Sequence, residues 1–252
     1  MKTPLIIANW KMNLNPAEAA ALAKKIAKVS AKHKNAEIVL CPSFTEIAAV
    51  ADCLRVSSVA LGAQDCFWEE SGAFTGEISP ASLRSYGVRY VLVGHSERRE
   101  YLSESGAMAH KKVQAALNHE LVPVLCVGES FVKRQEGQKE VVIIKQLQEA
   151  LGGLWLNKPD RLVVAYEPIW VIGSGQAVTA EEAEHTHLVI RQTLYDIFPH
   201  AVVAEQTVII YGGSVDPENA GAFMRQATVG GVLVGTASLD AAKFSAVIAA
   251  AK

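Results

Sequence analysis

Cysteine is scarce in this 252-residue sequence, which contains only Cys41, Cys53, Cys66 and Cys126. None of them has a partner at CxxC spacing, and their positions follow no regular framework. A fold built on disulfides is therefore excluded, and we expect reduced thiols, as in a cytosolic protein. Most of them should be small core residues. This includes Cys126, which is also a candidate for a functional thiol.

Long hydrophobic runs and clusters of one charge are lacking as well. No stretch approaches the length of a membrane span, and the apolar run before Asn9 is too short for a signal peptide. The 24 basic residues are balanced by 26 acidic ones, and no basic run suggests a nucleic-acid surface. We expect a cytoplasmic protein that binds neither membranes nor nucleic acids.

Apolar residues, by contrast, make up 50% of the sequence, which is enough for a large core. They form short β-rich runs that are nearly continuous rather than alternating: Leu5–Ala8, Ile38–Cys41, Val59–Ala63, Tyr90–Val93, Val122–Val127, Leu162–Tyr166, Val208–Tyr211 and Val232–Val234. Continuous apolar runs are typical of parallel strands that are buried on both faces. We therefore predict eight such strands.

Helix start signals lie between these runs. Asn15-Pro16-Ala17-Glu18 combines an N-cap residue, a proline in the first turn and a capping-box glutamate. Related signals occur at Ser79-Pro80, Thr179-Ala180-Glu181-Glu182 and Asp216-Pro217. Each of these signals predicts the beginning of a helix.

The alternation of eight strands with helices predicts an α/β fold, a single (β/α)8 barrel domain over residues 1–252. A doubly wound parallel sheet is the structural alternative. In a barrel the active site lies where strands end and the following loops begin. Polar residues or glycines follow five of the runs at that point: Asn9 and Lys11, His95 and Glu97, Glu167, Ser214, and Gly235 with Thr236.

A carboxylate, an imidazole, an ammonium group and an amide at one barrel mouth suit the enolisation of a phosphorylated carbonyl compound. The carboxylate can remove a proton from carbon while the imidazole polarises the oxygens. Glycines after the sixth, seventh and eighth runs let backbone N–H groups approach a phosphate. These groups predict an enzyme of sugar phosphates.

Six segments resemble signatures of the triosephosphate isomerase family, and they occur in family order over essentially the whole chain: Asn9-Trp10-Lys11-Met12-Asn13, Gly72-Ala73-Phe74-Thr75-Gly76-Glu77, Gly94-His95-Ser96-Glu97-Arg98-Arg99, Ala165-Tyr166-Glu167-Pro168-Ile169-Trp170, Tyr211-Gly212-Gly213-Ser214-Val215 and Leu233-Val234-Gly235. The resemblance implies a TIM-barrel isomerase without cofactor or metal. It would interconvert dihydroxyacetone phosphate and D-glyceraldehyde 3-phosphate through an enediol(ate), in glycolysis and gluconeogenesis.

The resemblance also implies roles for the polar residues. Glu167 would be the base that moves the proton between two carbons, and His95 would act on the two oxygens. Lys11 would offset the negative charge of phosphate and enediolate, Asn9 would help to hold the substrate, and Glu97 would support Lys11. A helix beginning at Ser96 would disfavour a positive charge on His95.

By the same resemblance, phosphate would bind to the N–H of Gly173, to Ser214 and to the N–H groups of Gly235 and Thr236. The segment Pro168–Val178, with Gly173 and Gly175 inside it, resembles a closing lid. Val171, Ser174, Gly230 and Thr236 depart from the family pattern. Thr236 can supply its amide only if its backbone angles suit a residue with a Cβ.

A homodimer is expected partly from the chain itself. The segment Gln64–Ser79 is long for a connection between strand and helix, and it carries Cys66, Phe67, Trp68 and Phe74. Such an apolar loop indicates an interaction surface, or else a loop folded back on its own barrel. The resemblance of Gly72–Glu77 favours insertion into the neighbouring subunit, with Thr75 near its Asn9 and Lys11.

Two other functions are compatible with the same barrel. One is an aldolase or lyase that forms a Schiff base through Lys11, although the sixth run contains no lysine. The other is a non-catalytic sugar-phosphate binding protein, which the intact polar set disfavours. A zinc site at His185 and His187 is disfavoured because residues two apart on a helix point to nearly opposite sides.

Overall fold

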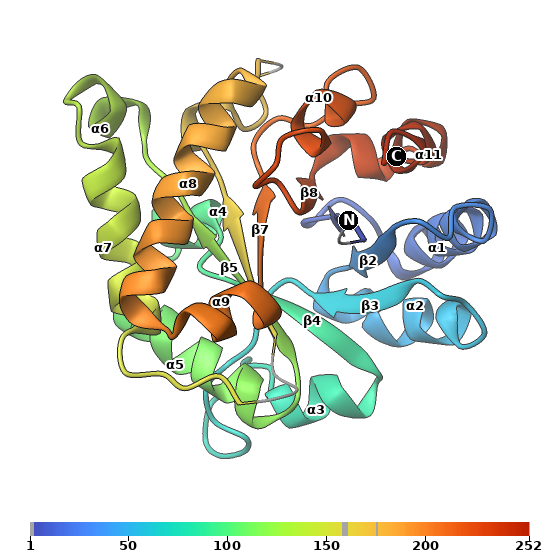
Figure 1. The fold of residues 1–252 in the computed structure, drawn as a ribbon. Coiled ribbons are helices and arrows are strands. Elements are labelled where there is room, and N and C mark those ends of the chain that lie inside the picture. The colour runs from blue at the N-terminus through green and yellow to red at the C-terminus, as the bar shows by residue number, and fades with distance from the viewer. Residues whose placement is uncertain (1–2, 158–160, 175, 252) are drawn as a thin grey trace.

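A computed structural model describes residues 3–157, 161–174 and 176–251 (Figure 1). Its strands are β1 Leu5–Asn9, β2 Glu37–Cys41, β3 Ala60–Ala63, β4 Val88–Val93, β5 Val122–Val127, β6 Leu162–Tyr166, β7 Thr207–Tyr211 and β8 Gly231–Val234. Its α-helices are α1 Pro16–Ser30, α2 Ile47–Leu54, α3 Pro80–Ser85, α4 Ser96–Tyr101, α5 Gly106–Asn118, α6 Phe131–Gln135, α7 Lys139–Leu151, α8 Ala180–Ile197, α9 His200–Gln206, α10 Ala220–Met224 and α11 Ala241–Ala249. Within these ranges no helix combines the length and apolarity needed to cross a membrane.

The strands form one closed parallel barrel in chain order. β8 pairs with β1, with Leu5 opposite Gly231 and Ala8 opposite Val234. This pairing confirms the predicted barrel and shows that the doubly wound alternative is wrong, since an open sheet leaves its outer strands unpaired. Each strand is followed by helical structure on the outside of the barrel (Figure 1).

Both faces of the strands are buried, which explains the continuous apolar runs. On β1, Leu5 and Ile7 belong to a cluster made only of strand residues, and this cluster fills the interior of the barrel. Ile6 and Ala8 belong to the larger cluster that the helices share. Successive side chains of a strand therefore pack alternately against the opposite strands and the surrounding helices.

Three of the four helix start signals are confirmed. Asn15 caps α1 with a complete capping box, and the side chains of Ser79 and Thr179 cap α3 and α8. The fourth prediction is wrong in position, because α10 begins at Ala220 rather than directly after Asp216. The Asp216 carboxylate accepts the N–H groups of residues 218 and 219, which closes a separate turn before the helix.

His187 on α8 is fully buried, whereas His185 is exposed, so the two imidazoles do not share a face of the helix. The Nδ1–H of His187 donates to the carbonyl of Thr228, 3.4 Å away, and Nε2 has no hydrogen-bond partner. Burial lowers the pKa of His187 from 6.5 to about 4, and the charge of Arg191 acts in the same direction.

We expect His187 to make the protein less stable as the pH falls. At pH values between its ordinary pKa and the lowered one, His187 is protonated in the unfolded chain but stays neutral in the folded protein. The free energy of unfolding therefore declines as the pH falls through that range. The expected contribution between pH 7 and pH 5 is about 2 kcal/mol. Urea unfolding at both pH values would measure it in the wild type and in His187→Gln. The decline should be smaller in His187→Gln and unchanged in the control His185→Gln. An equal decline in all three proteins would contradict the expectation.

Candidate active site

A cavity of about 730 Å³ opens where the strands end at their carboxyl termini. Asn9, Lys11, His95, Glu167, Gly173, Ser214, Gly235 and Thr236 all line it. The fold therefore brings together eight of the ten residues that the sequence singled out for a site. Glu97 and Thr75 do not line the cavity, but Glu97 contacts the lining residue Lys11.

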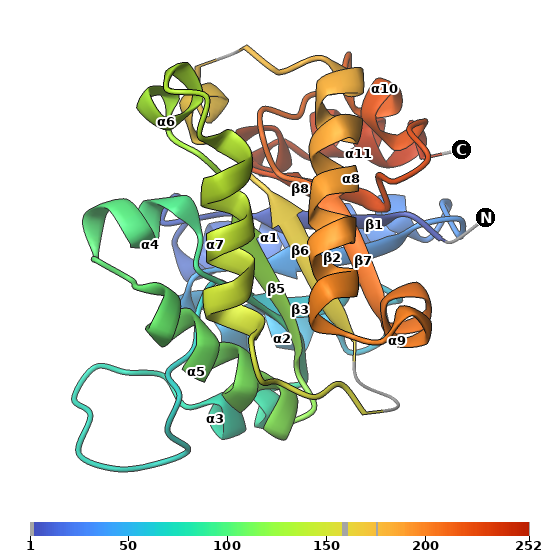
Figure 2. The same cartoon turned by 60° about the vertical axis from the view of Figure 1, so that its left-hand side comes forward.

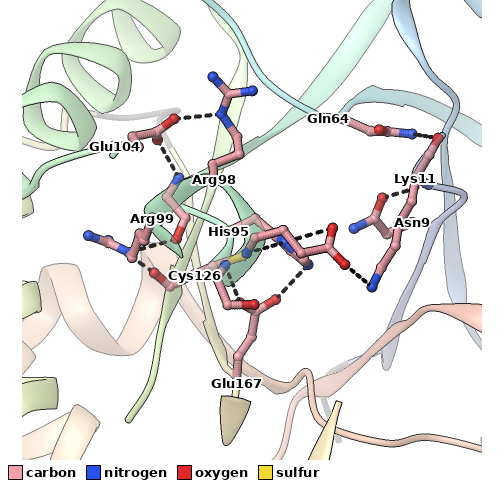
Figure 3. A network of polar contacts seen from close by, with 12 residues as sticks. Asn9, Lys11, Gln64, His95, Arg98, Arg99, Glu104, Cys126 and Glu167 are labelled. Atoms are coloured by element: carbon pink, nitrogen blue, oxygen red, sulfur yellow. Dashed lines mark hydrogen bonds and ion pairs between the residues drawn. The ribbon is translucent and has the colours of Figure 1, made fainter. Parts of the chain in front are cut away.

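Glu167 follows β6 directly and is almost completely buried, with 1% of its surface exposed. Its Oε2 accepts the backbone N–H of Ser96, the first residue of α4, at 3.0 Å. Its Oε1 lies 3.2 Å from Nε2 of His95 and has no hydrogen bond of good geometry (Figure 3). One carboxylate oxygen is thus anchored, and the other is left for a reacting group.

His95 occupies the N-cap position of α4, as the sequence predicted. Its Nδ1 accepts the backbone N–H of Glu97 at 3.3 Å. A ring nitrogen that accepts a hydrogen bond carries no proton, so the neutral imidazole has its proton on Nε2. The tautomer therefore presents an N–H donor beside Glu167.

Lys11 has a left-handed backbone with φ of 52°, a strained conformation for a residue other than glycine. Three contacts hold it there: its N–H donates to Oδ1 of Asn9 at 3.1 Å, its carbonyl accepts Nε2 of Gln64 at 2.8 Å, and its Nζ lies 2.5 Å from Oε1 of Glu97. The expected pairing of Lys11 with Glu97 is present. Lys11 lines the cavity, and its ammonium group is turned toward the Glu97 carboxylate (Figure 3).

Gly173, Ser214, Gly235 and Thr236 line the cavity as well. Gly173 has φ of 72°, Ser214 follows β7, and Gly235 precedes a short 3-10 helix, Thr236–Leu239. Thr236 is not among the described non-glycine residues with positive φ. Its backbone therefore suits a residue with a Cβ, which removes the concern raised by its departure from the family pattern.

The segment after Glu167 packs against Glu129. Trp170 donates its indole N–H to Oε1 of Glu129 at 3.0 Å, and the guanidinium of Arg134 lies 4.6 Å from the Trp170 ring centroid. Burial raises the pKa of Glu129 above its ordinary value, while hydrogen bonds from Trp170 and Tyr166 oppose that shift. Gly175, which the sequence placed in the same segment, lies outside the described residues.

Gln64 and Glu129 support the site without lining its cavity, and the sequence analysis did not identify them. Gln64 follows β3 directly, and Glu129 lies two residues after β5. Both therefore obey the rule that polar residues after a strand reach the mouth of the barrel. Applying that rule to the third and fifth strands would have found them.

Cys126 lies inside the barrel, fully buried among strand residues. Burial, together with the neighbouring Glu167 carboxylate, raises the pKa of its thiol well above the ordinary value. A thiol held in the protonated form is a poor nucleophile. Its position is that of a small core residue.

The loop between β3 and α3 extends away from the barrel (Figure 2). Its root packs inward, with Cys66 and Phe67 buried, so the expectation that both belong to an exposed apolar patch is wrong. Phe67 is covered by two neighbouring rings: it stacks on Trp68 at a centroid distance of 4.0 Å, and Phe74 is tilted against it at 4.7 Å. The tip is exposed from residue 69 to residue 77, including Thr75 and, with 44% of its surface, Phe74.

Comparisons with known proteins cover nearly the full length of the chain. A family model described as triosephosphate isomerase matches residues 4–251. Triosephosphate isomerases of Thermoanaerobacter sp. (strain X514) and Moorella thermoacetica are each 44% identical over 98% of this chain and over 99% and 98% of their own. The crystal structure of triosephosphate isomerase from Bartonella henselae superposes with a TM-score of 0.86 at 31% identity and covers 98% of both chains.

We expect Gly128→Ala to disrupt the backbone of the site. A Cβ at Gly128 would lie 1.7 Å from the carbonyl oxygen of Glu167, so the two chain segments would have to separate. The expected loss is about 3 kcal/mol in the free energy of unfolding, measured by urea denaturation. Gly221→Ala in α10 is the matched control and should stay within about 1 kcal/mol, because its Cβ meets only the flexible end of Arg225 and Ala250. Equal stabilities of Gly128→Ala and the wild type would contradict the expectation.

Proposed function

The chain belongs to the triosephosphate isomerase family, and from this premise we propose that its cavity interconverts dihydroxyacetone phosphate and D-glyceraldehyde 3-phosphate. The observation that carries the proposal is the meeting of His95 and Glu167. A carboxylate oxygen without a hydrogen bond and an imidazole nitrogen lie 3.2 Å apart in the wall of one cavity. This is the arrangement needed to remove a proton from carbon beside a polarised oxygen.

In the proposed reaction Glu167 takes a proton from C1 of dihydroxyacetone phosphate. The electron pair of that bond forms the double bond between C1 and C2, and the carbonyl oxygen on C2 becomes an oxyanion. The Nε2–H of His95 donates to this oxyanion and relays a proton from the oxygen on C1 to the oxygen on C2. Glu167 then returns its proton to C2, so the carbonyl group moves to C1 and the enzyme is restored.

Lys11 and the backbone amides would bind the charged parts of the substrate. The ammonium group of Lys11 stands at the cavity wall, where it offsets the charge of the phosphate and of the enediolate. Asn9 lies beside it, and its side chain also orients the Lys11 backbone. The N–H groups of Gly173, Gly235 and Thr236 and the Ser214 residue would hold the phosphate, while the segment Pro168–Val178 closes over it.

A Schiff-base aldolase is the weaker alternative for this site. Imine formation needs a Lys11 amine that is free to attack the carbonyl carbon, but its Nζ is held in an ion pair 2.5 Å from the Glu97 carboxylate. A binding protein without catalysis would not need the pairing of His95 with Glu167. Neither alternative has support from the named relatives, which are triosephosphate isomerases.

We further propose that the protein is a cytoplasmic homodimer and that each subunit is a single domain. The exposed tip of the β3–α3 loop carries Phe74, and Tyr101 and Leu102 are exposed at the end of α4 on the same side of the molecule (Figure 2). Exposed apolar side chains favour association with another protein surface. In the dimer Thr75 would lie near Asn9 and Lys11 of the partner subunit. The four cysteines are free, which suits the cytoplasm.

A coupled assay with dihydroxyacetone phosphate tests the function, and Glu167→Asp tests the role of the base. The shorter side chain withdraws the carboxylate by about 1 Å, and a misplacement of that size costs roughly 100-fold in rate. We expect kcat to fall by about that factor while KM changes by less than about threefold. Glu140→Asp, exposed on α7, is the matched control and should keep the wild-type kcat. Near wild-type kcat in Glu167→Asp would exclude Glu167 as the base.

Thr75→Arg should shift the protein toward the monomer and lower kcat at the same time. The added charge would have to enter the interface, where its desolvation costs free energy, and the partner's Asn9 and the partner's Lys11 would lose their support. Sedimentation and activity over one dilution series would measure both effects. Gln148→Arg adds the same charge at an exposed position on α7 and should change neither. A fully active Thr75→Arg monomer would show that the interface does not build the site.

A further inference from the structure

Arg99 on α4 connects two loops of the barrel mouth through its guanidinium group. Its Nε donates to the carbonyl of Gly94 at 2.7 Å, and its Nη2 donates to the carbonyl of Cys126 at 3.3 Å (Figure 3). Gly94 follows β4, and Cys126 lies near the end of β5. One planar side chain thus spans the ends of two neighbouring strands.

The two carbonyls lie directly before the groups that position the reacting side chains. Gly94 precedes His95 in the chain. Cys126 precedes Val127, whose carbonyl accepts the backbone N–H of Glu167 at 2.7 Å. A shift of either carbonyl would therefore move one of the two reacting side chains relative to the other.

The Gly94 peptide is held from its other side as well. Its N–H donates to Oε1 of Glu104 at 2.8 Å, and its φ of 69° is in the left-handed region. A Cβ at this position would come within 2.5 Å of Nη2 of Arg99, so the close approach of the guanidinium depends on glycine. Glu104 and Arg99 together fix the backbone just before His95.

Arg99 differs from the other charged residues around it. Arg98 and Lys112 form ion pairs with Asp65 and Glu104 at 2.6 to 2.8 Å, which balances two cations with two carboxylates. None of the ion pairs in the described ranges involves Arg99. The guanidinium of Arg99 is directed to backbone carbonyls, and its planar fork can donate to both of them at once.

We propose that Arg99 is a positioning residue for the isomerisation. Its two hydrogen bonds hold the ends of β4 and β5. They thereby keep Nε2 of His95 and the Glu167 carboxylate at the separation and orientation that the proton transfer requires. The inference rests on the proposed function, because it concerns the proton transfer between these groups. It assigns Arg99 no contact with the substrate, since Arg99 is not among the residues that line the cavity.

Arg99→Lys tests whether two hydrogen bonds from one planar group are needed, because lysine keeps the positive charge but lacks the planar pair of N–H donors. We expect kcat to fall between 10- and 100-fold, since a displacement near 1 Å costs roughly 100-fold. KM and the inhibition constant of inorganic phosphate should stay within about twofold, because the phosphate amides belong to other loops. Arg84→Lys, an exposed surface pair with Glu120, is the matched control and should keep wild-type kinetics.

A second variant separates positioning from loss of folding. Arg99→Ala should be weakly active, and millimolar guanidinium should restore its kcat at least fivefold, while sodium at equal ionic strength should not. An unrescued Arg99→Ala, a kcat within twofold of wild type in Arg99→Lys, or a parallel loss of kcat and phosphate affinity would overturn the inference. Absence of isomerase activity in the wild type would instead overturn the proposed function.

Discussion

The pairing of β8 with β1 is the constraint on which the rest of the structure depends. It closes the sheet, so all eight strands have neighbours on both sides and their carboxyl ends form one ring. Gly231 makes the pairing possible, because a Cβ at that position would lie 1.9 Å from the carbonyl oxygen of Leu5. Without closure, Asn9 on β1 and Gly235 after β8 would not line the same cavity.

The first turn of α4 organises the chemistry inside that ring. Free backbone N–H groups at a helix start need acceptors, and here they find functional side chains rather than ordinary caps. Ser96 donates to Glu167, and Glu97 donates to His95. The same two bonds orient the Glu167 carboxylate and select the tautomer of the His95 imidazole. A short helix thus positions the two side chains that we propose move the proton.

Local sequence was a good guide wherever one segment determines the outcome. Each predicted strand is present, with its ends displaced by at most two residues. The largest displacement is in β4, which begins at Val88. The predicted strand began at Tyr90, because the exposed Arg89 interrupts the apolar run. The prediction at Asp216 was wrong because its carboxylate serves a turn instead of the helix itself. That choice depends on backbone geometry, which residue types alone do not specify.

The sequence by itself determined the eight strands, the polar residues that follow them and the resemblance to the family, because apolar runs, capping residues and contiguous motifs are local properties. Only the tertiary structure decided how those residues meet. Ser96 and Glu167 are hydrogen-bonded although they are 71 positions apart in the sequence. Gln64 donates to the Lys11 carbonyl from 53 positions away in the sequence. Likewise, Phe67 is buried and Phe74 exposed within one loop. Such contacts depend on the relative placement of strands and loops, which follows from the closure of the barrel rather than from any one segment.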